Sequence, residues 1–130
     1  MQERSSCPEA SVLIVDDLAE WRARVRKILE RQPALQIVAE ACDGFQAIAR
    51  AAELKPDLVL LDIGMPVLNG LEAAGQIQTS SPQSKIVFLT QESDAGIRRT
   101  ALDAGARGYV LKSNAVSELL PTIGAILHQR

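Results

Sequence analysis

The chain has 130 residues, of which 47% are hydrophobic and 23% charged, and its formal net charge is −2. A chain of this length suits one domain that buries roughly two-thirds of the surface exposed by its unfolded form. The acidic balance and the 3% aromatic content leave no basic field for a phosphate backbone and few rings for stacking on bases, so we do not expect this segment to bind nucleic acid directly.

The N-terminal residues and the cysteines indicate a protein of the cytoplasm. Residues 1–10, MQERSSCPEA, lack the apolar stretch of a signal peptide, and no run approaches the roughly 18 apolar residues of a membrane span. Cys7 and Cys42 have no spacing typical of a metal site or a disulfide framework, so we predict two reduced thiols. We expect a flexible tail over residues 1–10 and one domain over residues 11–130.

The first half of the chain alternates between strand and helix patterns. The run SVLIV at 11–15 predicts a buried strand that ends at Asp16 and Asp17. A helix follows, with charged residues on its outer face, then a strand over 37–42, then an alanine-rich helix that Lys55-Pro56 terminates. The predicted apolar stripes of the two helices consist of Leu18, Trp21, Val25, Ile28 and Leu29, and of Ala47, Ile48, Ala51, Ala52 and Leu54.

The second half repeats this alternation three times. Residues 57–61 give the strongest strand signal and run into Asp62; further strands over 85–89 and 109–111 end at Thr90 and Lys112. The three helices carry Leu71, Ala74 and Ile77; then Ile97, Ala101 and Leu102; and finally Val116, Leu119, Leu120, Ile123, Ile126 and Leu127. We expect the second of these to be the most mobile helix, and Pro121 to cause a kink or a late start in the last.

Five alternations of strand and helix predict an α/β fold, a doubly wound parallel sheet with helices on both faces. The five-stranded order 2-1-3-4-5 places its switch point between the first and third strands, where ligands bind beyond the carboxyl ends. The sequence therefore predicts a three-layer sandwich with its functional site at that edge.

Polar residues end four of the predicted strands, and this placement predicts one shared pocket: Asp16 and Asp17, Asp62, Thr90, and Lys112. Three carboxylates so close together repel one another, so keeping all of them ionised requires a cation. Mg²⁺, or Mn²⁺, suits oxygen ligands of this kind. Asp62 would then be a nucleophile toward phosphorus, with Lys112 and Thr90 stabilising the charge on the phosphoryl oxygens.

Each of these residues also has an ordinary structural interpretation. An acidic pair after a strand is often a solvated turn, and a single Asp commonly caps a helix. Thr90 and Lys112 taken alone are typical surface residues, Tyr109 is typical of half-buried packing, and Trp21 of a core or a pocket rim. The functional hypothesis rests on their meeting at one edge of the sheet.

Four motifs resemble the response-regulator receiver family of CheY-like domains: VDD at 15–17, LLDIGMPVLNG at 60–70, LT at 89–90 and GYVLK at 108–112. Each motif alone is weak, but the ordered set is specific, and the resemblance spans about residues 11–127. The segment GARGYVLKSNAVSELLPTI is similar to receivers that precede a helix-turn-helix domain of the NarL/LuxR type.

The resemblance implies a signalling role with defined partners. A sensor histidine kinase would transfer a phosphoryl group from its phosphohistidine to Asp62, and phosphorylation would switch a surface that forms a homodimer or contacts a DNA-binding output domain, controlling transcription. Asp16, Asp17, Asp62 and the backbone carbonyl of Gly64 would hold the metal, while Thr90 and Tyr109 would form the switch pair. The chain would not be an enzyme beyond its own phosphorylation and dephosphorylation.

Three positions bear on the rates of phosphorylation and dephosphorylation or on the geometry of the peptide bond after Lys112. Gln91 stands where a small residue is usual, so we expect it to narrow the approach to Asp62 or to change the lifetime of the phosphate, and Gly64 is a second position that could tune these rates. Ser113 follows Lys112 where the family commonly has proline, in a bond that is often cis; without proline a cis bond costs roughly 2.5–4 kcal/mol.

Other function classes fit the sequence less well. A phosphatase of the haloacid dehalogenase type needs a second acid at the position of Gly64. The acidic loop that begins at Asp16 would repel the phosphate of a flavin, and no GxxxxGK loop is present for a nucleotide. A receiver that works only as a protein-interaction module remains an alternative, against which the complete set of acids and Lys112 argues.

Overall fold

The computed structural model describes residues 10–128. Of the tail predicted over residues 1–10, residues 1–9 lie outside this range and Ala10 is the first residue of a strand. Five parallel strands form one sheet in the order β2-β1-β3-β4-β5, as predicted. The strands are β1 (Ala10–Val15), β2 (Leu35–Ala41), β3 (Leu58–Leu61), β4 (Lys85–Thr90) and β5 (Gly108–Leu111). The helices are α1 (Ala19–Leu29), α2 (Gly44–Leu54), α3 (Gly70–Ser80), α4 (Ala95–Asp103) and α5 (Ala115–Leu127), with a short 3₁₀ turn at Lys112–Asn114.

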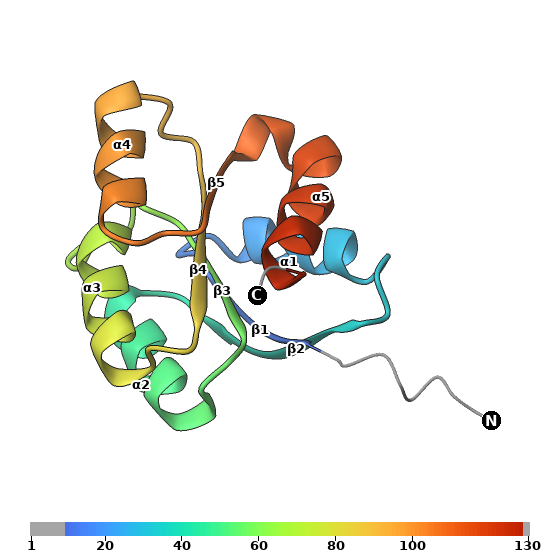
Figure 1. Cartoon of the computed structure of the whole chain (residues 1–130), viewed down its shortest axis with the longest axis horizontal. Coiled ribbons are helices and arrows are strands. Elements are labelled where there is room, and N and C mark those ends of the chain that lie inside the picture. Colours follow the sequence, from blue (N-terminus) through green and yellow to red (C-terminus); the bar gives the residue numbers. More distant parts are fainter. Residues whose placement is uncertain (1–9, 129–130) are drawn as a thin grey trace.

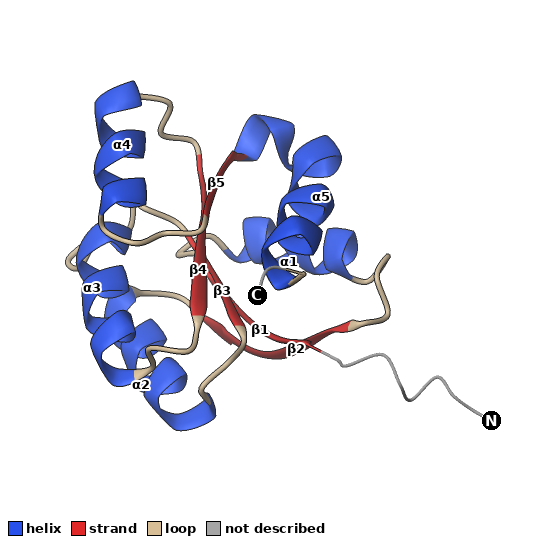
Figure 2. Ribbon diagram, viewed as in Figure 1, coloured by secondary structure: helices blue, strands red, loops and turns tan. Residues whose placement is uncertain are grey.

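The sheet separates two hydrophobic cores, because successive strand residues point to opposite faces. In β1, Leu13 and Val15 pack on the side of α2, α3 and α4, whereas Val12 and Ile14 pack on the side of α1 and α5. The same alternation runs through β3 and β4. Figures 1 and 2 show the resulting layers, with α1 and α5 on one side of the sheet and α2, α3 and α4 on the other.

Local signals explain where the helices on the three-helix side begin and end. Asn69 and Glu72 form a reciprocal capping box at the start of α3, and Asp94 caps α4 by accepting from Gly96 N and Ile97 N. Helix α2 ends where Lys55 adopts a left-handed conformation, φ 46°, directly before Pro56. The chain therefore reaches β3 through a sharp turn, as the Lys55-Pro56 pair predicted.

Five residues that were assigned to apolar stripes lie outside them. Leu18 precedes α1 and is 45% exposed, and Val116 is 72% exposed on α5. The buried positions of α5 are Ala115, Leu119, Ile123 and Ile126, whereas Ala52, Leu54 and Leu102 are exposed. Helical spacing alone groups Val116 with the buried Leu119 and Ile123, but Val116 in the first turn of α5 is exposed and lies outside the core cluster on that side of the sheet.

Helix α5 runs through Pro121 without a late start, because it begins at Ala115. Pro121 lies on the exposed side of the helix. The carbonyl of Ser117, which proline leaves without an intrahelical donor, can therefore bond to water. This corrects one of the two alternatives predicted for Pro121; the kink stays a prediction. Across residues 10–128, none of the helices has the length and apolar character that crossing a membrane requires.

Candidate functional site

The carboxyl ends of the strands bring together the acidic and basic residues singled out in the sequence. Asp16 directly follows β1, Asp62 follows β3, and Lys112 follows β5, while Thr90 is the last residue of β4. All four are buried, with between 1% and 7% of their surface exposed. Buried charged groups need partners, so the contacts among them decide what the site can do.

Lys112 lies between two of the acids. Its Nζ atom is 2.8 Å from Asp16 Oδ2 and 3.2 Å from Asp62 Oδ2. Burial disfavours the charged form of Lys112, but the hydrogen bond to Asp16 and the negative charge of Asp62 outweigh it, so the pKa of Lys112 is raised above its ordinary value. The ammonium group therefore stays charged at neutral pH and is held against Asp62.

The third acid, Asp17, completes a cluster that fits a divalent cation. One carboxylate oxygen from each of Asp16, Asp17 and Asp62 lies within 4.8 Å of the other two. Burial is the main cause that raises the pKa of Asp16, and the nearby charge of Asp62 adds to it. One ammonium cannot neutralise three carboxylates, and Asp17 is more accessible than the other two. Oxygen ligands with excess negative charge and an open side suit Mg²⁺ or Mn²⁺.

The loop that follows Asp62 folds back against it. Gly64 N donates to Asp62 Oδ1 at 3.3 Å, and Gly70 N donates to the Ile63 carbonyl at 2.9 Å. A Cβ atom at Gly70 would lie 2.1 Å from the Asp62 carbonyl oxygen, so only glycine fits there. Between these glycines, Val67 is 91% exposed and has φ 69°, a strained conformation for a β-branched residue.

Thr90 and Tyr109 are connected through the backbone of Glu92. Thr90 Oγ1 accepts a hydrogen bond from Glu92 N at 3.2 Å, and Tyr109 Oη donates to the Glu92 carbonyl at 2.6 Å. Burial, followed by the charge of Glu92, raises the pKa of Tyr109 above its ordinary value. Arg98 of α4 lies over the tyrosine ring, 5.8 Å from its centroid. A movement of the loop after β4 would therefore change the contacts of both predicted switch residues.

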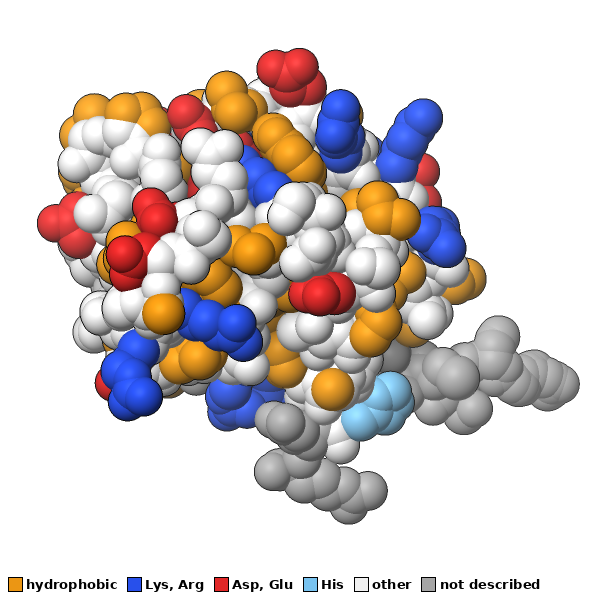
Figure 3. Space-filling view, turned by 90° about the horizontal axis from the view of Figure 1, so that it is seen from above, with side chains coloured by type: hydrophobic (Ala, Val, Ile, Leu, Met, Phe, Trp, Pro, Cys, Tyr) orange, Lys and Arg blue, Asp and Glu red, His pale blue; other side chains and the backbone are white. Residues whose placement is uncertain are grey.

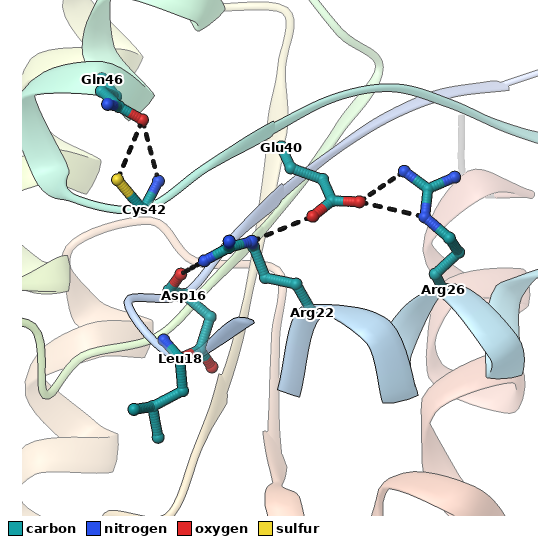
Figure 4. Close-up of polar contacts among 7 residues, drawn as sticks. All are labelled: Asp16, Leu18, Arg22, Arg26, Glu40, Cys42 and Gln46. Carbon is teal, nitrogen blue, oxygen red and sulfur yellow. Dashed lines mark hydrogen bonds and ion pairs between the residues drawn. The ribbon is translucent and has the colours of Figure 1, made fainter. Parts of the chain in front are cut away.

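Two residues of α1 also belong to the site, and only one of them was expected there. The Trp21 ring lies over Lys112, with Nζ 5.0 Å from its centroid, so Trp21 is at the pocket rim, one of its two predicted places. Arg22 was assigned to the solvent face, but its Nη1 donates to the Asp16 carbonyl at 2.6 Å and its Nε to Glu40 of β2 at 2.9 Å (Figure 4). No motif indicated this contact, because Arg22 is one of several basic residues in α1.

The remaining predicted positions lie around the pocket. Gln91 is exposed immediately after Thr90, and its effect on rate stays a prediction. Within residues 10–128 there is no cis peptide bond, so Lys112-Ser113 is trans. On the face in Figure 3, basic side chains are interspersed with acidic, apolar and uncharged ones and form no continuous stripe.

Comparison with known proteins agrees with this geometry. The family model for the response regulator receiver domain matches residues 12–124. The transcriptional regulatory protein LnrK of Bacillus subtilis is 36% identical over 112 residues, 86% of this chain and 51% of that protein. A protein-glutamate methylesterase/protein-glutamine glutaminase of Colwellia psychrerythraea is 39% identical over 92% of this chain and 32% of its own length. The chain thus spans about half the length of the first relative and about a third of the length of the second.

A solved structure extends the likeness to the fold. The crystal structure of a two-component response regulator of the LuxR family from Aurantimonas sp. superposes with a TM-score of 0.87 at 35% identity, covering 92% of this chain and 85% of that one. Fold, strand-end residues and family match therefore agree. The chain belongs to the response regulator receiver family of two-component systems, with relatives of the LuxR type.

Proposed function

We propose that this receiver takes a phosphoryl group onto Asp62 from the phosphohistidine of a sensor histidine kinase, in a reaction that requires Mg²⁺. The observation that carries the proposal is the position of Asp62 at the switch point of the sheet, where Lys112 and two further acids surround it. Asp16, Asp17, Asp62 and the carbonyl of Gly64 would hold the metal. Bound there, Mg²⁺ would offset the charge that gathers on the phosphoryl oxygens.

The side chains of the pocket have separate roles in the transfer of the phosphoryl group. An Asp62 carboxylate oxygen forms a bond to phosphorus while the phosphorus–nitrogen bond of the donor breaks, and the electron pair returns to the donor imidazole. Asp62 Oδ1 accepts from Gly64 N and Oδ2 from Lys112, which fixes the plane of the nucleophile. Lys112 and the Thr90 hydroxyl then stabilise the charge on the phosphoryl oxygens.

The output is a change of surface on the side of β4 and β5. A phosphoryl group adds about two negative charges, which would draw Thr90 and Lys112 toward Asp62. Because Thr90 and Tyr109 both bond to the Glu92 backbone, this shift would reach the surface formed by α4, β5 and α5. We expect a pre-existing equilibrium to move and a homodimer or an output domain to bind there.

The relatives suggest what the output is. LnrK is a transcriptional regulatory protein, and the Aurantimonas protein is of the LuxR family. We therefore propose that the receiver acts in the cytoplasm and controls transcription through a helix-turn-helix domain outside these 130 residues. An enzymatic output, as the name of the Colwellia relative describes, is the second candidate. The receiver itself would catalyse only its own phosphorylation and dephosphorylation.

Intact-mass measurement tests the chemistry. The protein, Asp62→Ala and the control Asp103→Asn, in which an acid at the end of α4 is neutralised, are incubated with acetyl phosphate, with and without Mg²⁺. We expect one added phosphoryl group on the protein and on the control, only with Mg²⁺, and none on Asp62→Ala. Absence of any adduct, also in rapidly quenched samples, would overturn the acceptor role and favour a module that works through protein contacts alone.

A further inference from the structure

Every polar atom of Asp16 is held by a different part of the chain. Its N–H donates to the Ala41 carbonyl at 3.1 Å, and its carboxylate accepts from Leu18 N at 2.9 Å and from Lys112 Nζ at 2.8 Å. Its own carbonyl oxygen accepts from Arg22 Nη1 at 2.6 Å. The last contact comes from a long side chain, so something must keep that side chain in place.

Glu40 keeps Arg22 in place (Figure 4). Its carboxylate accepts from Arg22 Nε at 2.9 Å and also pairs with Arg26, and the hydrogen bond to Arg26 is the main cause that lowers the pKa of Glu40. The Arg22 side chain is only 18% exposed and that of Glu40 29%. Glu40 and Ala41 are consecutive in β2, so this strand holds both the carbonyl of Asp16, through Arg22, and its N–H.

The held carbonyl fixes the peptide plane that leads into Asp17. The carbonyl of Asp16 and the N–H of Asp17 belong to one planar peptide unit, so fixing the first fixes the second. Within residues 10–128, the Asp17 carboxylate makes no hydrogen bond or ion pair, and its position therefore depends on the backbone. Its oxygen nevertheless lies within 4.8 Å of oxygens of Asp16 and Asp62.

We propose that Arg22, held by Glu40, is a positioning residue that orients the Asp16–Asp17 peptide and thereby sets the affinity of the pocket for a divalent cation. This inference rests on the metal-dependent function proposed above. The positioning role and a purely electrostatic role of Arg22 predict opposite changes in cation affinity when Arg22 is removed. If Arg22 acted only as a nearby positive charge, its removal would strengthen cation binding; if it positions the acids, its removal weakens binding.

The experiment measures Mg²⁺ affinity directly. Mg²⁺ is titrated into the protein, Arg22→Gln, Arg22→Lys and the control Arg26→Gln by calorimetry, and by the fluorescence of Trp21, the single tryptophan, which lies beside Lys112. We expect Arg22→Gln to bind about tenfold more weakly, as is typical when a group that orients a metal ligand is lost. Arg22→Lys keeps the charge but loses the planar fork, and should bind several-fold more weakly.

Arg26→Gln separates position from charge. It loses the same charge from the same helix and the same Glu40 partner, but does not contact Asp16, so its affinity should be unchanged or slightly higher. At saturating Mg²⁺ the rate of Arg22→Gln with acetyl phosphate should return to within about twofold of the unchanged protein, because loss of a positioning contact alters metal affinity and leaves the acceptor intact. Thermal unfolding without metal verifies that each variant is folded.

The outcomes distinguish this inference from the proposed function. If Arg22→Gln binds Mg²⁺ as tightly as the unchanged protein or more tightly, the positioning role is wrong and the acceptor role stands. An equal loss in Arg26→Gln would also overturn it, since the effect would then belong to charge or to helix α1 as a whole. If the unchanged protein binds no Mg²⁺, both proposals are wrong.

Discussion

The two sides of the carboxyl edge of the sheet are built differently. Around β1 and β3, Asp16 is fixed through its N–H, its carbonyl and both carboxylate oxygens, and Asp62 lies against the tight loop that Gly70 closes. Around β4 and β5, helix α4 has Ala101 as its only fully buried residue, and Tyr109 is half-buried. The first region is tightly held and the second loosely.

This difference matches the demands of a switch. Phosphoryl transfer needs reacting groups held in a fixed geometry, whereas a change of surface needs an element whose rearrangement costs little free energy. The chain places its acids on the tightly held side and its predicted switch residues, Thr90 and Tyr109, next to the loosely held helix. Four predictions test this division.

The largest effect is expected from Lys112→Met, which removes the positively charged partner of two acids on the held side, Asp16 and Asp62. Removing the ammonium takes away a group 3.2 Å from Asp62 Oδ2, and loss of one such charge-stabilising donor typically slows a reaction by about 10²-fold. The phosphorylation rate at saturating Mg²⁺ should fall by roughly that factor. Lys55→Met, which lies after α2 and bonds to the Ser80 carbonyl, is the control. A rate within about threefold of the unchanged protein would contradict the role of Lys112.

Hydrogen exchange compares the loosely held helix with a well-packed one. Helix α5 buries Ala115, Leu119, Ile123 and Ile126, whereas α4 buries Ala101 alone. Amides in the middle of α4 should exchange at least about tenfold faster than those in the middle of α5, because fewer apolar contacts oppose local opening. Mass spectrometry of exchanged peptides measures both helices in one experiment. If the amides of α4 and α5 exchanged equally slowly, α4 would not be loosely held, and the contrast between the two sides would be wrong.

Tyr109→Phe removes the hydrogen bond between the tyrosine hydroxyl and the Glu92 carbonyl, 2.6 Å long, and leaves the ring. Such a bond contributes about 1 kcal/mol to the free energy of unfolding, so urea unfolding should show a loss of that size. The phosphorylation rate should stay within about twofold, since the Tyr109 hydroxyl bonds to the Glu92 carbonyl and not to Asp62. A large loss of phosphorylation rate would mean that the switch residues around β4 and β5 also contribute to the reaction at Asp62.

The smallest effect concerns pH. The pKa of Glu40 is lowered, chiefly by the hydrogen bond to Arg26, so its ionised form is favoured in the folded state. Its contribution to stability is therefore present above the ordinary pKa of a glutamate and is lost as the pH falls through the lowered value. Because the pair is partly exposed, we expect no more than about 1 kcal/mol. Comparing unfolding of the protein and Glu40→Gln between neutral and acidic pH measures it.

Much of the fold and the candidate site could be predicted, because parallel strands end at one edge. Once the runs before Asp16, Asp62 and Lys112 are read as buried strands, their meeting follows from topology alone. The errors concern residues such as Leu18, which precedes α1, and Val116, which lies in the first turn of α5; both are apolar but exposed.

The contacts of Arg22 could not be predicted in this way. They require Glu40 to lie beside Ile14, and the register of β2 shifts between Val12 and Leu13 of its partner strand. A shift of one residue places a side chain on the opposite face, and the sequence gives no sign of it. The bridge from Tyr109 to Thr90 was equally hidden, because it uses the backbone of Glu92, which has no sequence signature.

The close approach of Gly70 to Asp62 has a consequence for how related chains can differ. The Ile63 carbonyl accepts from Gly70 N, and a side chain at position 70 would collide with the main chain of the acceptor. The hydrogen bond between the two ends of the loop from 63 to 70, together with the lack of space at Gly70, therefore fixes the length of this loop. Insertions or deletions within it would displace the acceptor itself, so length variation in this lineage should occur in other loops, and position 70 should tolerate no residue larger than glycine.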